Sequence, residues 1–168
     1  MADTSEHNSR KQEIINASIK LFYEKGYDFT TTRELAVASN ISAAGLYYFF
    51  KDKQEILFNI LYDSVNNLYE TLESTIKPND DPLINVKRYI RSIISYVLQN
   101  KVTFTILMRE DLRLNKSQLE IINNKRRNAF EVIKNELVKL QIINRIKRLD
   151  PAVIATNPPK APEKTASI

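Results

Sequence analysis

Residues 27–55 constrain the fold of this chain more than any other stretch. The three threonines at 30–32 offer an N-cap, and residues 33–38 then predict a short helix. A tight turn follows, in which Asn40 can adopt the left-handed backbone conformation that such a turn needs. Ser42 is expected to cap a second short helix. Two short helices joined by a tight turn form a helix-turn-helix, whose second helix is shaped to lie in a DNA major groove.

The second of these helices has two different faces. Leu46, Phe49 and Phe50 project to one side, where we expect them to pack inward. The adjacent Tyr47 and Tyr48 fall on the other side and are expected to face outward. Two neighbouring tyrosines are unusual on a solvated surface, so the alternative is that both rings are buried in a core or an interface.

The run from Ile14 to Leu57 resembles the N-terminal domain of TetR-family transcriptional repressors. It carries the residue types of that family in the family's order: Ala17, Leu21-Phe22, Gly26-Tyr27, Thr-Thr with Arg33, Leu35-Ala36, Ser42, Leu46-Tyr47, Phe50, Lys53 and Leu57. Three positions depart from the pattern. Asn40 stands where the family usually has a turn glycine, Ala44 where it often has glycine, and Gly45 where it commonly has threonine or serine. The last two change the surface that contacts bases, so the operator cannot be taken from a relative.

The resemblance implies a set of DNA contacts. Backbone N–H groups and threonine hydroxyls at the start of the first short helix would hold phosphate, and Arg33 would reach phosphate or a guanine edge. Small residues would let the second helix sit deep in the groove, its tyrosines would contact phosphates or sugars, and Lys53 would bind a phosphate. The predicted DNA-binding residues are Thr31, Thr32, Arg33, Ser42, Ala43, Ala44, Gly45, Tyr47, Tyr48 and Lys53.

The whole chain is predicted to be all-α, because it has two glycines and no long alternating strand pattern. We expect an N-terminal three-helix DNA-binding domain with a helix-turn-helix, followed by a helical ligand-binding and dimerisation bundle that lacks its last helices. The predicted organisation is a disordered tail (1–8), the helix-turn-helix domain (9–52), the ligand-binding and dimerisation domain (53–155) and an irregular tail (156–168).

The end of the sequence departs from the resemblance. Asp150 and Pro151 predict a helix start, yet three prolines in residues 158–162 prevent the helix from continuing. The family continues here with two helices that form the dimer seam. Their absence predicts a truncated or frame-shifted product, or alternatively a short relative with an extended tail. A homodimer is implied by the family and is in doubt for this sequence, so the competing hypothesis is a helical interaction module with only weak, nonspecific DNA binding.

The second domain suggests a switch operated by a small apolar effector. Aromatic residues and a methionine on its predicted helices are candidates to line a pocket between them, or are ordinary core residues. These candidates are Tyr62, Tyr89, Tyr96, Phe104, Met108 and Phe130. In its basic run Lys125-Arg126-Arg127 the chain also resembles family members that sense fatty-acyl compounds, which implies an acyl-type effector, although a charge run is more often a solvated face.

Other classes of function find little support in the composition. The chain has no cysteine and a single histidine in the expected tail, so we predict no metal site, no cofactor and no enzymatic activity. No signal peptide or membrane span is predicted, and a cytoplasmic location follows. The net charge of +5 is no argument for DNA binding, because the basic excess lies in residues 116–168, far from the helix-turn-helix.

Overall fold

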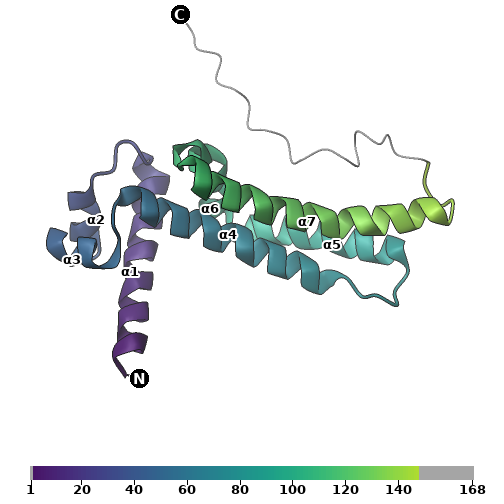
Figure 1. The fold of residues 1–168 in the computed structure, drawn as a ribbon, viewed down its shortest axis with the longest axis horizontal. Coiled ribbons are helices and arrows are strands. Elements are labelled where there is room, and N and C mark those ends of the chain that lie inside the picture. Colours follow the sequence, from purple (N-terminus) through teal and green to yellow (C-terminus); the bar gives the residue numbers. More distant parts are fainter. Residues whose placement is uncertain (1, 148–168) are drawn as a thin grey trace, which may run out of the picture. The chain divides into compact units, whose positions relative to one another are not determined.

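The computed structural model describes residues 2–147, with side chains from Ser5 onward. Within this range all regular structure is helical and no strand occurs, which confirms the predicted all-α fold (Figure 1). The elements are α1 (Ala2–Lys25), α2 (Thr32–Ala38), α3 (Ala43–Phe49), α4 (Lys53–Thr75), α5 (Pro82–Gln99), α6 (Lys101–Glu110), the 3₁₀ turn η1 (Asp111–Arg113) and α7 (Lys116–Ile142).

The N-terminus differs from the expectation. The segment 1–8, expected to be a disordered tail, is helical from Ala2 onward as the first turns of α1. The ring of His7 contacts the ring of Phe49 at a centroid distance of 4.8 Å, and such aromatic packing stabilises these turns. The predicted helix start at Asp150 and the irregular tail 156–168 lie outside the described residues.

The described helices group into two compact units. The first comprises residues 2–66 and 97–122, and the second comprises residues 67–96 and 123–147. Helices α4, α5 and α7 contribute to both. The sequence-based boundary after residue 52 therefore differs from this grouping, since the first half of α4 packs in the same core as the helix-turn-helix.

The first unit has one apolar core behind its two short helices. On α1 the apolar side chains of Ile14, Ile15 and Phe22 are buried in this core. Ser18 on the same face is also buried, and its hydroxyl donates to the carbonyl oxygen of Ile14 at 2.7 Å. The other buried apolar residues of this core are Leu35, Ala36, Leu46, Phe50, Ile56, Leu57, Ile60, Leu61, Val65, Ile106, Leu107, Leu114 and Ile122.

The second unit has a smaller apolar core with polar groups buried beside it. Tyr89 is buried, its hydroxyl donates to the carbonyl oxygen of Ala129 at 2.6 Å, and burial raises the pKa of its phenol to about 12. Asn85 is fully buried and donates to the carboxylate of Glu136 and to the carbonyl oxygen of Lys77, both at 2.9 Å. These bonds supply the partners that buried polar groups require.

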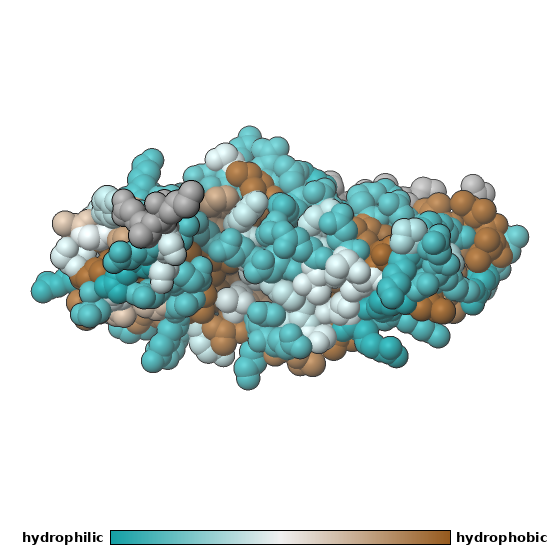
Figure 2. All heavy atoms as spheres, turned by 90° about the horizontal axis from the view of Figure 1, so that it is seen from below, coloured by the Kyte–Doolittle hydropathy of each residue, from teal (hydrophilic) through white to brown (hydrophobic). Residues whose placement is uncertain are grey.

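The outer surface is mainly hydrophilic on the face shown in Figure 2, where hydrophobic atoms occur in separate patches. Several large apolar side chains are nonetheless exposed along α5, where Ile90, Ile94 and Leu98 recur at every fourth residue. Residues four apart share one face of a helix, so these three lie on a common apolar side of α5.

Candidate nucleic-acid interface

Helix α2 begins with a reciprocal capping arrangement. Thr31 is the N-cap, and its hydroxyl oxygen accepts from the N–H of Glu34 at 3.2 Å while the Glu34 carboxylate accepts from the N–H of Thr31 at 2.8 Å. The ammonium of Lys25 pairs with the same carboxylate at 2.5 Å. This pairing, together with the cap bonds, lowers the pKa of Glu34 to about 2. The end of α1 is thereby joined to the start of α2.

The turn between α2 and α3 confirms the prediction for Asn40. Its φ of 53° is the left-handed conformation, which asparagine tolerates better than most residues. The guanidinium of Arg10 on α1 donates to the carbonyl oxygen of Asn40 at 3.1 Å. The hydroxyl of Ser39 donates to the carbonyl oxygen of Leu35 at 2.8 Å. The turn is therefore bound to both α1 and α2.

The start of α3 is built from one cap and three small residues. Ser42 is the N-cap, as predicted, and its hydroxyl oxygen accepts from the N–H of Gly45 at 3.0 Å. Ala43 and Ala44 are exposed, so both are available to a partner. A β-carbon at Gly45 would lie 3.3 Å from the Ser42 hydroxyl oxygen and 3.5 Å from the Ile41 β-carbon. Glycine at this position thus has a local packing reason in addition to the predicted close approach of DNA.

The two faces of α3 lie as the sequence predicts. Leu46 and Phe50 are 1% and 2% exposed and anchor the helix to the core, whereas Tyr47 and Tyr48 are 54% and 73% exposed. The alternative in which both tyrosine rings are buried is excluded. Phe49 differs slightly, because it is half-buried at the edge of the core and not wholly inside it.

The predicted phosphate donors of α2 are only partly free. The N–H and the hydroxyl of Thr31 both donate to the Glu34 carboxylate, at 2.8 and 2.9 Å. Thr32 is half-buried, and Arg33 is exposed. In the isolated protein Arg33 is therefore the residue of this group best able to reach a phosphate.

Lys53 is engaged within the protein and is not a freely extended cation. Its ammonium donates to the carbonyl oxygens of Tyr27 and Thr30 at 2.7 and 2.8 Å, which uses two of its three N–H groups. The same nitrogen lies 4.1 Å from the centroid of the Tyr27 ring. Burial lowers the pKa of Lys53, although Asp28 nearby acts in the opposite direction. The sequence-based prediction of a phosphate contact at Lys53 overlooked these two carbonyl partners.

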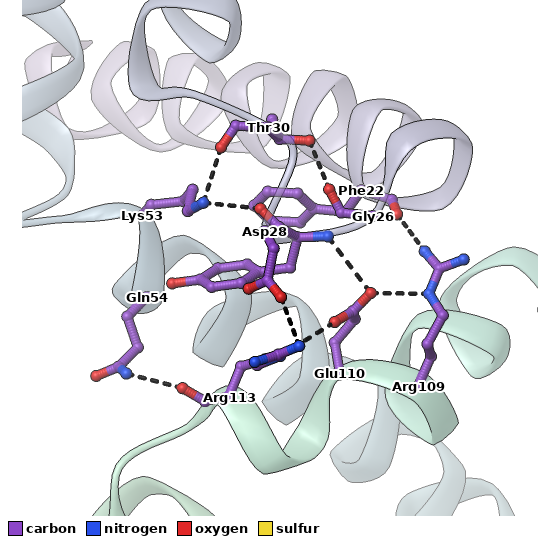
Figure 3. Close-up of polar contacts among 10 residues, drawn as sticks. Phe22, Gly26, Asp28, Thr30, Lys53, Gln54, Arg109, Glu110 and Arg113 are labelled. Carbon is purple, nitrogen blue, oxygen red and sulfur yellow. Dashed lines mark hydrogen bonds and ion pairs between the residues drawn. The ribbon is translucent and has the colours of Figure 1, made fainter. Parts of the chain in front are cut away.

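A buried carboxylate fastens the loop that precedes α2 (Figure 3). Glu110, at the end of α6, is 5% exposed. Its carboxylate accepts from the backbone N–H of Tyr27 at 3.3 Å and from Nε of Arg109 at 2.8 Å. Arg113 of η1 approaches the other oxygen at 3.8 Å. The loop between α1 and α2 is thus attached to the corner formed by α6 and η1.

The two arginines of this corner reach the end of α1 and the loop that follows it (Figure 3). At the end of α1, Arg109 donates to the carbonyl oxygen of Phe22, which also accepts from the N–H of Gly26 at 3.0 Å, and to the carbonyl oxygen of Tyr23 at 3.4 Å. Arg113 pairs with Asp28 in the loop at 2.5 Å. In the sequence, a charged pair that follows the apolar residues of α6 is a signal for these contacts. The sequence could not indicate the partners of this pair, which lie some 83 to 87 positions away.

The predicted effector-binding residues fall in different units. Tyr62 and Phe104 pack against the core of the first unit, while Met108 of the same unit is 63% exposed. Tyr89 is buried in the second unit, where Tyr96 and Phe130 are half-buried. A pocket lined by these six residues stays a prediction.

Among the described residues, no helix is long and apolar enough to cross a bilayer. The same residues contain no group of three or more histidine, cysteine, aspartate or glutamate side chains arranged to hold a metal ion.

Residues 14–60 match the family described as bacterial regulatory proteins, tetR family. The chain is 31% identical over 99 residues to the HTH-type transcriptional regulator AcrR of Shigella flexneri, a match that covers 58% of this chain and 44% of AcrR. It is 43% identical over 61 residues to IcaR of Staphylococcus aureus strain Newman, the negative transcriptional regulator of the biofilm operon icaADBC. That match covers 34% of this chain and 33% of IcaR. The chain therefore spans less than half the length of each of these relatives.

Solved structures extend the similarity in fold over most of the chain. The regulator PfmR from Thermus thermophilus superposes with a TM-score of 0.76 at 25% identity, covering 83% of this chain and 76% of PfmR. AibR, solved in complex with isovaleryl coenzyme A and operator DNA, superposes with a TM-score of 0.76 at 21% identity, covering 86% and 78% of the two chains.

Proposed function

Because residues 14–60 of this chain belong to the TetR family of bacterial regulatory proteins, we propose that it is a transcriptional repressor that binds duplex DNA through α3. The two-sided α3 carries this proposal, since Leu46 and Phe50 hold it to the core while Tyr47 and Tyr48 face outward. A short helix presented in this way after a tight turn fits a major groove. The name of IcaR, a negative regulator, supports repression as the outcome of binding.

The contacts divide into those that specify sequence and those that position the protein. The exposed Ala43 and Ala44 let the start of α3 approach base edges, and their methyl groups contact thymine methyls. The hydroxyls of Tyr47 and Tyr48 donate to phosphates on either side of the groove. Arg33 on α2 adds a cation to the phosphate contacts. Contacts with the phosphates of the DNA backbone thus account for affinity, and the close approach of the small residues of α3 to base edges accounts for sequence selectivity.

The experiment begins with selection of bound duplexes from random DNA. Tyr47→Phe removes one hydroxyl from the surface, and a hydrogen bond to a charged phosphate is worth about 1.5–3 kcal/mol, so we expect at least a tenfold loss of affinity. Arg33→Gln should weaken binding and reduce the salt slope by about one unit, because one counterion fewer is released. Tyr69→Phe in the second unit is the matched control and should leave affinity unchanged. Wild-type affinity in both interface variants would refute these contacts.

A response to an effector extends the proposal. AibR, whose fold this chain shares, is known with an acyl coenzyme A thioester and operator DNA together. On this basis we propose that this chain also binds a small apolar, acyl-type molecule among its bundle helices, and further that this binding weakens its hold on the operator. Titrating a preformed protein–DNA complex with acyl thioesters of increasing chain length measures the release. A complex that survives the whole series would remove the effector from the proposal and leave DNA binding intact.

Operator binding by a pair of chains is the remaining part of the proposal. Repressors with a helix-turn-helix bind two half-sites about one helical turn apart, one with each subunit of a symmetric dimer. Light scattering of the complex should therefore give two chains on each duplex. A single chain with only nonspecific, salt-sensitive binding would favour the helical interaction module.

A further inference from the structure

His7, the only histidine of the chain, lies against the helix proposed to contact DNA. Its ring centroid is 4.8 Å from that of Phe49 and 5.6 Å from that of Tyr48, to which it stands nearly perpendicular at 76°. The rings of Tyr48 and Phe49 are themselves perpendicular, at 5.0 Å and 88°. Edge-to-face contacts at these separations are attractive. The three rings therefore form one cluster between the first turns of α1 and the second half of α3.

Two other residues on the same side of α1 contact the helix-turn-helix. Arg10 donates to the carbonyl oxygen of Asn40 in the turn at 3.1 Å. The ammonium of Lys11 lies 5.2 Å from the ring centroid of Phe50. Positions 7, 10 and 11 follow the spacing that places residues on one face of a helix. The start of α1 is thus a support for both the turn and α3.

An open groove of about 440 Å³ separates the two elements beside the ring cluster. It is lined by Glu6, His7, Ser9, Arg10, Glu13, Tyr48 and Phe49. The charged groups that face the imidazole are therefore Glu6, Arg10 and Glu13 from α1, with the Arg10 guanidinium paired to Glu13. Tyr48 is the titratable group that α3 contributes. His7 itself is half-buried, so its ring keeps access to solvent.

We propose that His7 is a positioning residue for Tyr48 in DNA binding and that its imidazole takes up a proton when the duplex binds. This inference rests on the proposed function. Tyr48 is 73% exposed, and the contacts with His7 and Phe49 restrict where its ring lies. Because the ring centroids of Tyr48 and His7 lie 5.6 Å apart, a phosphate bound by Tyr48 would bring negative charge toward the imidazole, and a nearby negative charge favours the protonated form. Histidine is the side-chain type whose charge generally changes between pH 5 and 8, so the test lies within that range.

Two substitutions separate the packing of the ring from its charge. His7→Phe keeps an aromatic ring that cannot be protonated, whereas His7→Ala removes both properties. At pH 8 we expect His7→Ala to weaken affinity for the selected duplex about tenfold, the order of one aromatic pair, and His7→Phe to bind like the wild type. Between pH 8 and pH 6 the wild type should gain about threefold to tenfold in affinity, a gain that His7→Phe lacks. Asn8→Ala, an exposed neighbour, is the matched control and should follow the wild type at every pH.

NMR spectroscopy offers a measurement that does not depend on affinity. Because the chain has one histidine, its imidazole proton resonances can be identified without distinguishing them from those of other histidines. Phe49→Leu should shift these resonances in the free protein by removing the adjacent ring. Addition of the selected duplex should move the midpoint of their pH titration upward.

The outcomes separate this inference from the proposed function. Wild-type protein that selects no duplex refutes both. Wild-type protein that selects a duplex, with His7→Ala binding it equally well, overturns only the role of His7. A pH-dependent gain that persists in His7→Phe, or a titration midpoint that the duplex does not move, overturns the proton uptake.

Discussion

The helix-turn-helix and the loop that precedes it, residues 26–31, are held in place in opposite ways. The two short helices begin with caps that bond three residues ahead, Thr31 with Glu34 and Ser42 with Gly45. The loop instead depends on side chains far along the chain, since Lys53 binds it across 26 positions and Glu110 across 83. Both regions belong to the same compact unit.

This difference means that the shape of the helix-turn-helix and its attachment have separate origins. Local chemistry forms the two helices and the turn. The polar contacts of α4, α6 and η1 hold the loop from which α2 departs (Figure 3). Residues outside the two short helices therefore help to fix the loop from which α2 departs, and substitutions can test each origin separately.

The largest expected effect comes from the core anchor of α3. Leu46→Ala removes a side chain that is 1% exposed, and such a cavity costs about 2–5 kcal/mol in the free energy of unfolding. Denaturant titration measures the loss. Val37→Ala on α2, where the side chain is 73% exposed, is the control and should change stability by less than about 0.5 kcal/mol. Equal effects of the two substitutions would show that α3 is not anchored through Leu46.

The next effect concerns the attachment of the loop. Glu110→Ala leaves the N–H of Tyr27 and the guanidinium of Arg109 without their acceptor, which should cost about 1–3 kcal/mol. Asp28→Asn breaks only the exposed pair with Arg113 and should cost no more than about 1 kcal/mol. Operator affinity should fall in Glu110→Ala under conditions where the variant is fully folded. Unchanged affinity would mean that the loop keeps its position without Glu110.

The turn should show a smaller and purely local effect. Asn40→Ala puts alanine, which disfavours a positive φ, at a position whose φ is 53°. The expected cost is about 1–2 kcal/mol in the free energy of unfolding. Asn40→Gly meets no such penalty and should be close to neutral. Thermal unfolding of the three proteins compares them directly. A glycine variant as unstable as the alanine variant would place the role of Asn40 in its side chain and not in its backbone.

The smallest effect is a dependence on acidity at the start of α2. The pairing with Lys25 and the cap bonds lower the pKa of Glu34 to about 2, below its ordinary value of 4.5. A carboxylate whose pKa is lower in the folded state than in the unfolded state stabilises the folded protein at pH values above the unfolded-state pKa. This contribution disappears as the pH falls from 4.5 toward 2. Unfolding curves of wild type and Glu34→Gln should therefore differ at neutral pH and converge in acid. Glu131→Gln, which breaks an exposed pair on α7, is the control. A difference that stays constant down to about pH 2 would contradict the role assigned to Glu34.

Most of the helix-turn-helix could be predicted because its determinants are near one another in sequence. Caps, an asparagine in the turn and the alternation of Leu46 with Tyr47 are local signals, and all three are confirmed. The family model matches residues 14–60, within the run whose residue types resemble the N-terminal domain of TetR-family regulators. The first turns of α1 were missed, because a short polar segment carries no local sign that His7 packs on Phe49.

The sequence by itself determined the all-α class, the two short helices and the outward direction of Tyr47 and Tyr48. Helical spacing and capping act over three or four residues, so neighbouring letters suffice to reveal them. Only the tertiary structure decided that Lys53 binds carbonyl oxygens, that Glu110 holds the loop before α2 and that His7 meets α3. Each of these contacts joins residues separated by 23 to 83 positions or lying on different helices, and no local rule selects such a partner among the many polar groups of the chain.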